Sequence, residues 1–121
     1  MAAALNGHQQ LVQTLLAANA DVNTNMGDGV TALMLASAQG HQQVVQTLLA
    51  TKADVNAKAS DGYTALIRAS MNGHLQVVQA LLIANADVNV KAGDGYTALT
   101  WASTQGHQEV VQLLKKAGAK E

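Results

Sequence analysis

The dipeptide Gly-His occurs four times in this chain of 121 residues, and consecutive occurrences are 33 residues apart. The neighbouring residues repeat with the same period: residues 28–60 read DGVTALMLASAQGHQQVVQTLLATKADVNAKAS, and residues 61–93 read DGYTALIRASMNGHLQVVQALLIANADVNVKAG. A fixed period of this length indicates a stack of small structural units. We therefore expect a repeat protein in which neighbouring units share one hydrophobic core.

Each full unit carries the signals of two short helices. Threonines precede the Ala-Leu runs at Thr31, Thr64 and Thr97, where a hydroxyl can accept a hydrogen bond from a first-turn amide. The first helix of the second copy is predicted over residues 32–39, with Gly40 in the left-handed conformation at its end. A second helix begins near His41. Its apolar stripe at helical spacing consists of Val44, Val45, Leu48 and Leu49.

Turns complete the unit. The second helices are predicted to end where the backbone needs a positive φ, at Asn19, Lys52, Asn85 and Gly118. Gly and Asn suit that conformation, whereas Lys52 should be slightly unfavourable. Ala-Asp-Val-Asn follows, and Asp-Gly then marks a tight reversal at Asp28, Asp61 and Asp94. The unit is helix, turn, helix and protruding turn, and it cannot bury its apolar face alone.

This unit resembles the ankyrin repeat. TALMLASAQGHQQVVQTLLATKADVNAKASDG is similar to the family wording T-P-L-H-x-A-A-x-x-G-H-x-x-V-V-x-x-L-L-x-x-G-A-D-V-N-A, and the similarity covers the whole chain. The resemblance implies an all-α repeat solenoid of stacked helix-turn-helix units with protruding β-turn loops. Three family positions differ: proline is replaced by Ala32, Ala65 and Ala98, histidine by Met34, Ile67 and Thr100, and the second alanine by Ser37, Ser70 and Ser103. We expect somewhat less stability per unit, because a rigid first turn and a polar tie are lost.

In this register residues 1–121 form a single ankyrin repeat domain. It is divided into a partial repeat over residues 1–27, repeats over 28–60 and 61–93, and a C-terminal capping repeat over 94–121. In the last repeat Lys115 stands where the interior repeats have Leu49 or Leu82, and Lys116 stands where they have Ala50 or Ile83. We expect these interior residues to be stacking residues. Lys120 replaces Asp54 or Asp87. Charges in place of stacking residues indicate a polar cap.

The first repeat has no such protection. It keeps the apolar residues Leu5, Leu11, Val12 and Leu15. Upstream sequence could cover them, or a second copy of the chain could, and self-association through the uncapped N-terminal repeat stays open.

Composition excludes several partner classes. The net charge is −1, which gives no electrostatic reason to expect a nucleic acid or an anionic membrane. No apolar run approaches the roughly 18 residues of a membrane span, so we expect a soluble chain. Cysteine is absent, and the expected compartment is the cytoplasm, although the sequence itself does not identify the compartment.

Catalytic and metal sites are also not expected. Equivalent histidines of neighbouring repeats would lie roughly 8–10 Å apart, too far to share an ion, so each histidine should instead begin a helix and tie a loop to its neighbour. Asp21, Asn23 and Asn25 are spaced like calcium ligands, but Met26 and Ala32 replace the glycine and glutamate that such a loop needs. Nucleophile–base arrangements and phosphate loops are missing as well. We expect a chain that is not an enzyme and needs no cofactor.

Function is expected where equivalent positions differ although the fold does not require it. The family resemblance implies that protruding turns and first helices form a concave face that grips partner proteins. The candidate partner-binding residues on that face are Val30, Leu35, Gln39, Ser60, Tyr63, Arg68, Met71, Asn72, Tyr96, Trp101, Thr104 and Gln105.

Arg68 and Trp101 are the leading candidates, because Trp, Tyr and Arg carry most of the binding energy of interfaces. Arg68 could pair with an acidic or phosphate group of the partner. The alternative reading, in which Trp101 and the two tyrosines only cover the small-residue core, stays open.

The sequence thus favours a noncatalytic module that binds a protein or peptide of unknown identity on its concave face. One alternative is a structural spacer from a longer repeat array. Another is a small-ligand or nucleotide binder that stacks a base between aromatic rings. That binder would need a closed pocket, against which the open row of Tyr63, Tyr96 and Trp101 argues.

Overall fold

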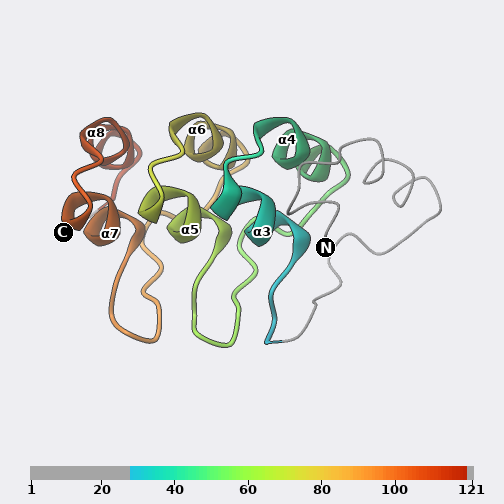
Figure 1. The fold of residues 1–121 in the computed structure, drawn as a ribbon, viewed down its shortest axis with the longest axis horizontal. Coiled ribbons are helices and arrows are strands. Elements are labelled where there is room, and N and C mark those ends of the chain that lie inside the picture. Colours follow the sequence, from blue (N-terminus) through green and yellow to red (C-terminus); the bar gives the residue numbers. More distant parts are fainter. Residues whose placement is uncertain (1–27, 120–121) are drawn as a thin grey trace.

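The computed structural model describes residues 28–119, which form two rows of α-helices. In chain order the helices are α3 (Ala32–Gln39), α4 (Gln42–Ala50), α5 (Ala65–Met71), α6 (Leu75–Ile83), α7 (Ala98–Thr104) and α8 (Gln108–Lys116). Helices α3, α5 and α7 lie in one row and α4, α6 and α8 in the other, and long loops protrude beside the first row (Figure 1). The expected all-α solenoid is confirmed, and no strand occurs among these residues.

Several sequence expectations lie outside the described residues. They include the partial repeat over residues 1–27, its apolar residues Leu5, Leu11, Val12 and Leu15, and its helix end at Asn19. The calcium-like run that begins at Asp21, and Lys120 near the C-terminus, lie outside them too. Self-association through the first repeat therefore stays a prediction.

The predicted helix caps are confirmed. The hydroxyl oxygens of Thr31, Thr64 and Thr97 accept hydrogen bonds from the backbone amides three residues on, at 3.3, 3.2 and 3.1 Å. Gly40 ends α3 with a φ of 75°. Lys52 and Asn85 both follow the second helices with a φ of 68°, so lysine occupies the left-handed conformation that we expected to be unfavourable for it.

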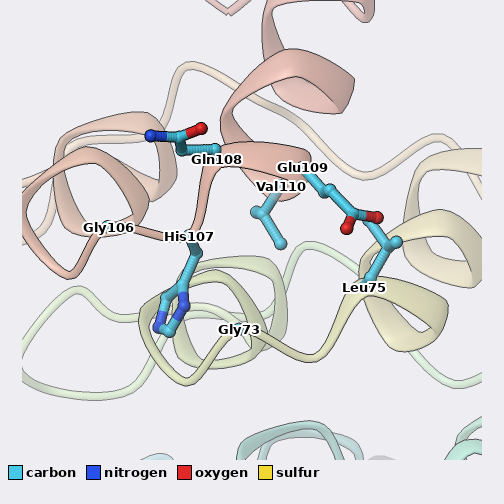
Figure 2. A pocket seen from close by; sticks show the side chains of 7 residues that line it. All are labelled: Gly73, Leu75, Gly106, His107, Gln108, Glu109 and Val110. Carbon is cyan, nitrogen blue, oxygen red and sulfur yellow. The ribbon is translucent and has the colours of Figure 1, made fainter.

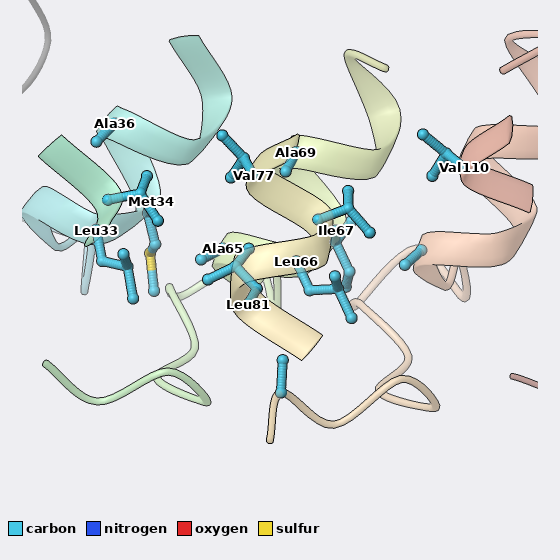
Figure 3. Packing of buried hydrophobic residues seen from close by; sticks show 14 of the residues in the cluster. Leu33, Met34, Ala36, Ala65, Leu66, Ile67, Ala69, Val77, Leu81 and Val110 are labelled. Atoms are coloured by element: carbon cyan, nitrogen blue, oxygen red, sulfur yellow. The ribbon is translucent and has the colours of Figure 1, made fainter. Parts of the chain in front are cut away.

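Contacts between neighbouring repeats build the core. Each first helix packs on the next one in its row, each second helix does the same, and the two helices of a repeat pack on each other. Figure 3 shows part of the resulting cluster of small and medium apolar side chains, including Leu33, Met34, Leu66, Ile67, Val77 and Leu81. Of the three positions that lack the family's histidine, Met34 and Ile67 are 1% exposed and lie fully inside the stack, whereas Thr100 in the last repeat is exposed.

One expectation about stacking is wrong. Leu49 and Leu82 are half-buried against the core, as expected, and Lys115 at their position in α8 is exposed. The neighbouring position does not stack, because Ala50 is exposed and Ile83 is 84% exposed. Ile83 is the last residue of α6 and lies about 100° around the helix from Leu82, away from the core.

The recurring Gly-His dipeptide has a structural explanation. The Nε2 atom of His74 lies 3.0 Å from the carbonyl oxygen of Ala38, and Nε2 of His107 lies 3.2 Å from that of Met71. These rings occupy the space beside the glycines of the preceding repeat: a Cβ atom at Gly40 or Gly73 would lie 2.6 Å from a ring nitrogen. The expectation that each histidine begins a helix and ties a loop to its neighbour is confirmed for His74 and His107.

Replacement of these glycines tests the contact. Gly73 and Gly106 have nearly equal φ values of 73° and 76°, but a Cβ at Gly106 would meet no atom of residues 28–119 within 4 Å. Gly106→Ala should therefore destabilise the chain only through its backbone, by about 1 kcal/mol. Gly73→Ala should destabilise it by about 1 to 3 kcal/mol more, because the His107 ring must leave its place. Urea unfolding followed by circular dichroism measures both, and equal losses would contradict the contact.

Two serine hydroxyls lie buried inside the stack. The hydroxyl oxygens of Ser37 and Ser70 are fully buried and have no hydrogen-bond partner among residues 28–119, whereas Ser103 at the equivalent position is exposed. A buried polar group without a partner loses its bonds to water and gains nothing in return. We expect Ser37→Ala and Ser70→Ala each to stabilise the chain by about 1 kcal/mol more than Ser103→Ala does.

Ser103→Ala is the matched control for this prediction, since all three substitutions bring the same gain in helix propensity. Thermal or urea unfolding of the three variants supplies the comparison. Equal effects in all three would show that burial of the hydroxyl has no influence.

Candidate functional site

Four of the candidate residues meet at one place, where the repeats containing α5 and α7 adjoin. Tyr63 and Tyr96 lie just before the helix N-caps, and Arg68 and Trp101 are the fourth residues of α5 and α7. The Trp101 ring centroid lies 4.8 Å from that of Tyr96 and 6.4 Å from that of Tyr63, and both pairs are tilted. These distances are in the range at which aromatic rings attract one another.

The Asp-Gly turns fix the tyrosines. The amides of Tyr63 and Tyr96 each donate a hydrogen bond of 3.0 Å to the side chain of the aspartate two residues earlier. Gly62 and Gly95 between them have φ values of 82° and 83°, which explains the need for glycine. Successive loops are also joined directly, since the amide of Gly93 donates a 2.8 Å bond to the carbonyl oxygen of Asp61. The loops therefore form a ladder that carries the aromatic side chains.

The Tyr63 hydroxyl is the centre of a polar bridge between the two repeats. It donates a hydrogen bond of 2.5 Å to the Asp94 carboxylate and accepts one of 2.9 Å from the indole nitrogen of Trp101. Both partners belong to the following repeat. Tyr63 therefore has a structural role, and it packs partly against the core, whereas Tyr96 is exposed.

Arg68 is held within its own repeat. Its guanidinium lies 3.6 Å from the Asp61 carboxylate and 5.6 Å from the ring centroid of Tyr63, and its side chain is only 19% exposed. We expected Arg68 to pair with an acidic or phosphate group of a partner. Such a group would have to compete with Asp61, which already neutralises the guanidinium.

The bridge changes the titration of both its acids. The hydrogen bond from Tyr63, followed by that from the Tyr96 amide, lowers the pKa of Asp94 below its ordinary value of 3.8. Burial and then the hydrogen bond to Asp94 raise the pKa of Tyr63. At neutral pH the carboxylate is therefore ionised and the hydroxyl keeps the proton that it donates.

The other candidates are not part of this cluster. The carbonyl group of Met71 binds His107, the side-chain amide of Asn72 donates to the carbonyl oxygen of Arg68, and the Ser60 amide belongs to the loop ladder. Val30 packs partly against the core, Leu35 is half-buried, and Gln39, Thr104 and Gln105 are exposed. The structure thus gathers Tyr63, Arg68, Tyr96 and Trp101 and leaves the rest spread along the first row.

Sequence reasoning missed the two carboxylates of the cluster. The sequence assigns Asp61 and Asp94 only to the tight turns, because Asp-Gly opens the second, third and fourth copies alike. The useful signal is the spacing Asp-Gly-Tyr, which occurs at residues 61–63 and 94–96 but not in the second copy, where Val30 replaces the tyrosine. It places a carboxylate and an aromatic ring on one loop.

Open hollows lie elsewhere on the surface. One of about 460 Å³ is at the start of α8 (Figure 2) and is lined by Gly73, Leu75, Gly106, His107, Gln108, Glu109 and Val110. Another of about 430 Å³ lies between α6 and α8 and is lined by Gln79, Leu82, Ile83, Leu113, Lys116 and Ala117. Neither contains a residue of the aromatic cluster, so the cluster is a surface feature rather than the wall of these hollows.

Across residues 28–119, no three His, Asp or Glu side chains come together as ligands of one metal ion would. In the same part of the chain, no helix combines the length and the apolar character that crossing a membrane requires.

Comparison with protein families gives a match over the whole chain. The family described as ankyrin repeats (3 copies) matches residues 1–92 and again residues 61–121. A search of curated proteins finds no match.

The polar bridge can be tested by removal of one oxygen. Tyr63→Phe should destabilise the chain by about 1 kcal/mol, because the partly buried Trp101 indole nitrogen loses its acceptor. The exposed Asp94 carboxylate loses a donor as well. Tyr96→Phe is the matched control, since no contact of the Tyr96 hydroxyl is found among the described residues, and it should leave the free energy of unfolding unchanged. Urea unfolding at pH 7 measures the difference.

Acid should reduce this difference. Because the Tyr63 hydroxyl lowers the pKa of Asp94, the ionised carboxylate stabilises the fold above its ordinary pKa of 3.8 and ceases to do so as the pH falls through the lowered value. The effect of Tyr63→Phe should be full at neutral pH and shrink below about pH 4. An effect that stays constant down to pH 2 would contradict the assigned bond.

Proposed function

Because the chain belongs to the ankyrin repeat family, whose members are generally modules for protein–protein interaction, we propose that it is a noncatalytic module that binds a protein or peptide partner on its concave face. The concave face is the side formed by the protruding loops and the first helices α3, α5 and α7. Members of the family are typically noncatalytic, which agrees with this proposal.

The observation that carries the proposal is the partly exposed aromatic pair of the last repeat. Tyr96 is 36% exposed, and Trp101, half-buried beside it, occupies the position that is Leu35 in the second copy. The fold accepts leucine at this position, so packing alone does not require tryptophan. Exposed Trp and Tyr side chains that a partner can bury supply much of the energy of protein interfaces.

In this proposal residues 1–121 are one domain with repeats divided at residues 27/28, 60/61 and 93/94. The last repeat is a cap, which Lys115 supports, because it is exposed at the position where Leu49 and Leu82 pack against the core. The central contact residues are Tyr96 and Trp101, and Asp61 and Asp94 join them. The more scattered candidates, from Val30 to Gln105, would form the margin of the interface.

Substitutions borrowed from the chain's own second copy test this surface. Tyr96→Val and Trp101→Leu introduce the residue types that the second copy has at the equivalent positions, Val30 and Leu35, so the fold already accommodates them there. Partners captured from an extract of the source cells, identified by mass spectrometry and then purified, should bind the double variant at least about tenfold more weakly. Titration calorimetry measures the affinity of each purified partner.

The matched control is Ile83→Ala. It removes the most exposed large apolar side chain from the outer row and installs the residue of Ala50. Its affinity for the partner should equal that of the parent chain. Equal binding by the parent and by the double variant, with circular dichroism unchanged, would refute the assigned surface.

A further inference from the structure

Two consecutive repeats place an aspartate, a tyrosine and a variable residue at equivalent positions. In the repeat over residues 61–93 these are Asp61, Tyr63 and Arg68, and in the next repeat they are Asp94, Tyr96 and Trp101. In both, the tyrosine amide donates a 3.0 Å hydrogen bond to the aspartate side chain. Aspartate and tyrosine thus form the same corner of carboxylate and aromatic ring twice.

The first of these corners is occupied by the chain itself. The Arg68 guanidinium lies 3.6 Å from Asp61 and 5.6 Å from the Tyr63 ring centroid, which is the range of a cation–π contact. The chain therefore contains an example of the group that this corner binds. That group is a planar cation held by charge on one side and by a ring on the other.

The second corner lacks an internal cation. Trp101 replaces the arginine, and within residues 28–119 no cation is paired with Asp94, which is exposed. The Trp101 ring also enlarges the aromatic surface beside Tyr96. Two hydrogen bonds, from the Tyr63 hydroxyl and the Tyr96 amide, hold the Asp94 carboxylate in place and leave its remaining lone pairs available.

We propose that the corner of Asp94, Tyr96 and Trp101 binds the guanidinium of an arginine that the partner presents. The inference rests on the interaction function proposed above and gives the chemistry of its central contact. Arginine is favoured over lysine because its guanidinium is planar, weakly hydrated and able to stack on a ring while it binds a carboxylate. The partner surface that meets this corner is thus basic, opposite to the acidic group that Arg68 alone would have suggested.

Nuclear magnetic resonance with small probes tests the corner without a known partner. The probes are Nα-acetyl-arginine amide and its citrulline analogue, which has nearly the same shape but no charge. The arginine probe should shift the Trp101 indole and Tyr96 amide resonances saturably in the millimolar range, about fivefold more strongly than the citrulline probe. Trp101 is the only tryptophan, so its indole resonance is unambiguous.

Asp94→Asn is the decisive variant. The oxygen of asparagine can accept the bond of the Tyr96 amide, and its NH2 group can donate to the Tyr63 hydroxyl oxygen, so the corner should keep its shape while it loses its charge. The response to the arginine probe should then fall to that of the citrulline probe. Equal responses of the parent chain to both probes, no saturable shift, or a full arginine response in Asp94→Asn would each overturn the inference.

Arg68→Gln tests the argument from the equivalent repeat. It empties the first corner, so the arginine probe should now also shift the Tyr63 amide, and no such gain would contradict the equivalence. Failure of the arginine tests is distinguishable from failure of the proposed function. If the arginine tests fail but a partner still binds the Tyr96→Val/Trp101→Leu variant more weakly, the interaction surface is upheld and only the assignment of arginine is rejected.

Discussion

The contact between the histidine of one repeat and the glycine of the repeat before it is the constraint on which the stack depends. The His107 ring fills the space beside Gly73 and reaches the Met71 carbonyl oxygen, and His74 does the same at Gly40 and Ala38. A ring held by shape and by a hydrogen bond fixes both the distance and the rotation between repeats. That spacing brings Tyr63 within hydrogen-bond distance of Asp94 and Trp101 and so builds the aromatic cluster.

Most of the fold could be predicted from the sequence, because its signals are local and repeated. Threonine caps, the apolar stripe of the second helices and the positive φ at Lys52 all follow from the chemistry of single residues and short spacings. The exposure of Ile83 could not be predicted in this way. Apolar character predicts burial, but the last residue of a helix can face away from the core.

The candidate site was predictable in position but not in its contacts. Differences between equivalent residues identified Tyr63, Arg68, Tyr96 and Trp101, yet the bridge joins side chains 31 and 38 residues apart in the sequence. One separation is shorter and the other longer than the 33-residue period. The pairing of these side chains therefore depends on their rotamers, which the sequence pattern does not contain. Consequently Asp61 and Asp94 were assigned to turns, and the two tyrosines, which looked equivalent, have different environments: Tyr63 is held by its hydroxyl, and Tyr96 is more open.

The single indole has a consequence for how unfolding of this chain is observed. Trp101 touches Tyr63 and Tyr96 and nothing aromatic further along the stack, so its fluorescence reports on the junction between the last two described repeats. Circular dichroism, in contrast, averages over every helix. In a linear array each repeat is stabilised mainly by its neighbours, and one end can come apart before the other. Any separation between the fluorescence and dichroism midpoints would therefore measure how cooperatively the repeats are coupled.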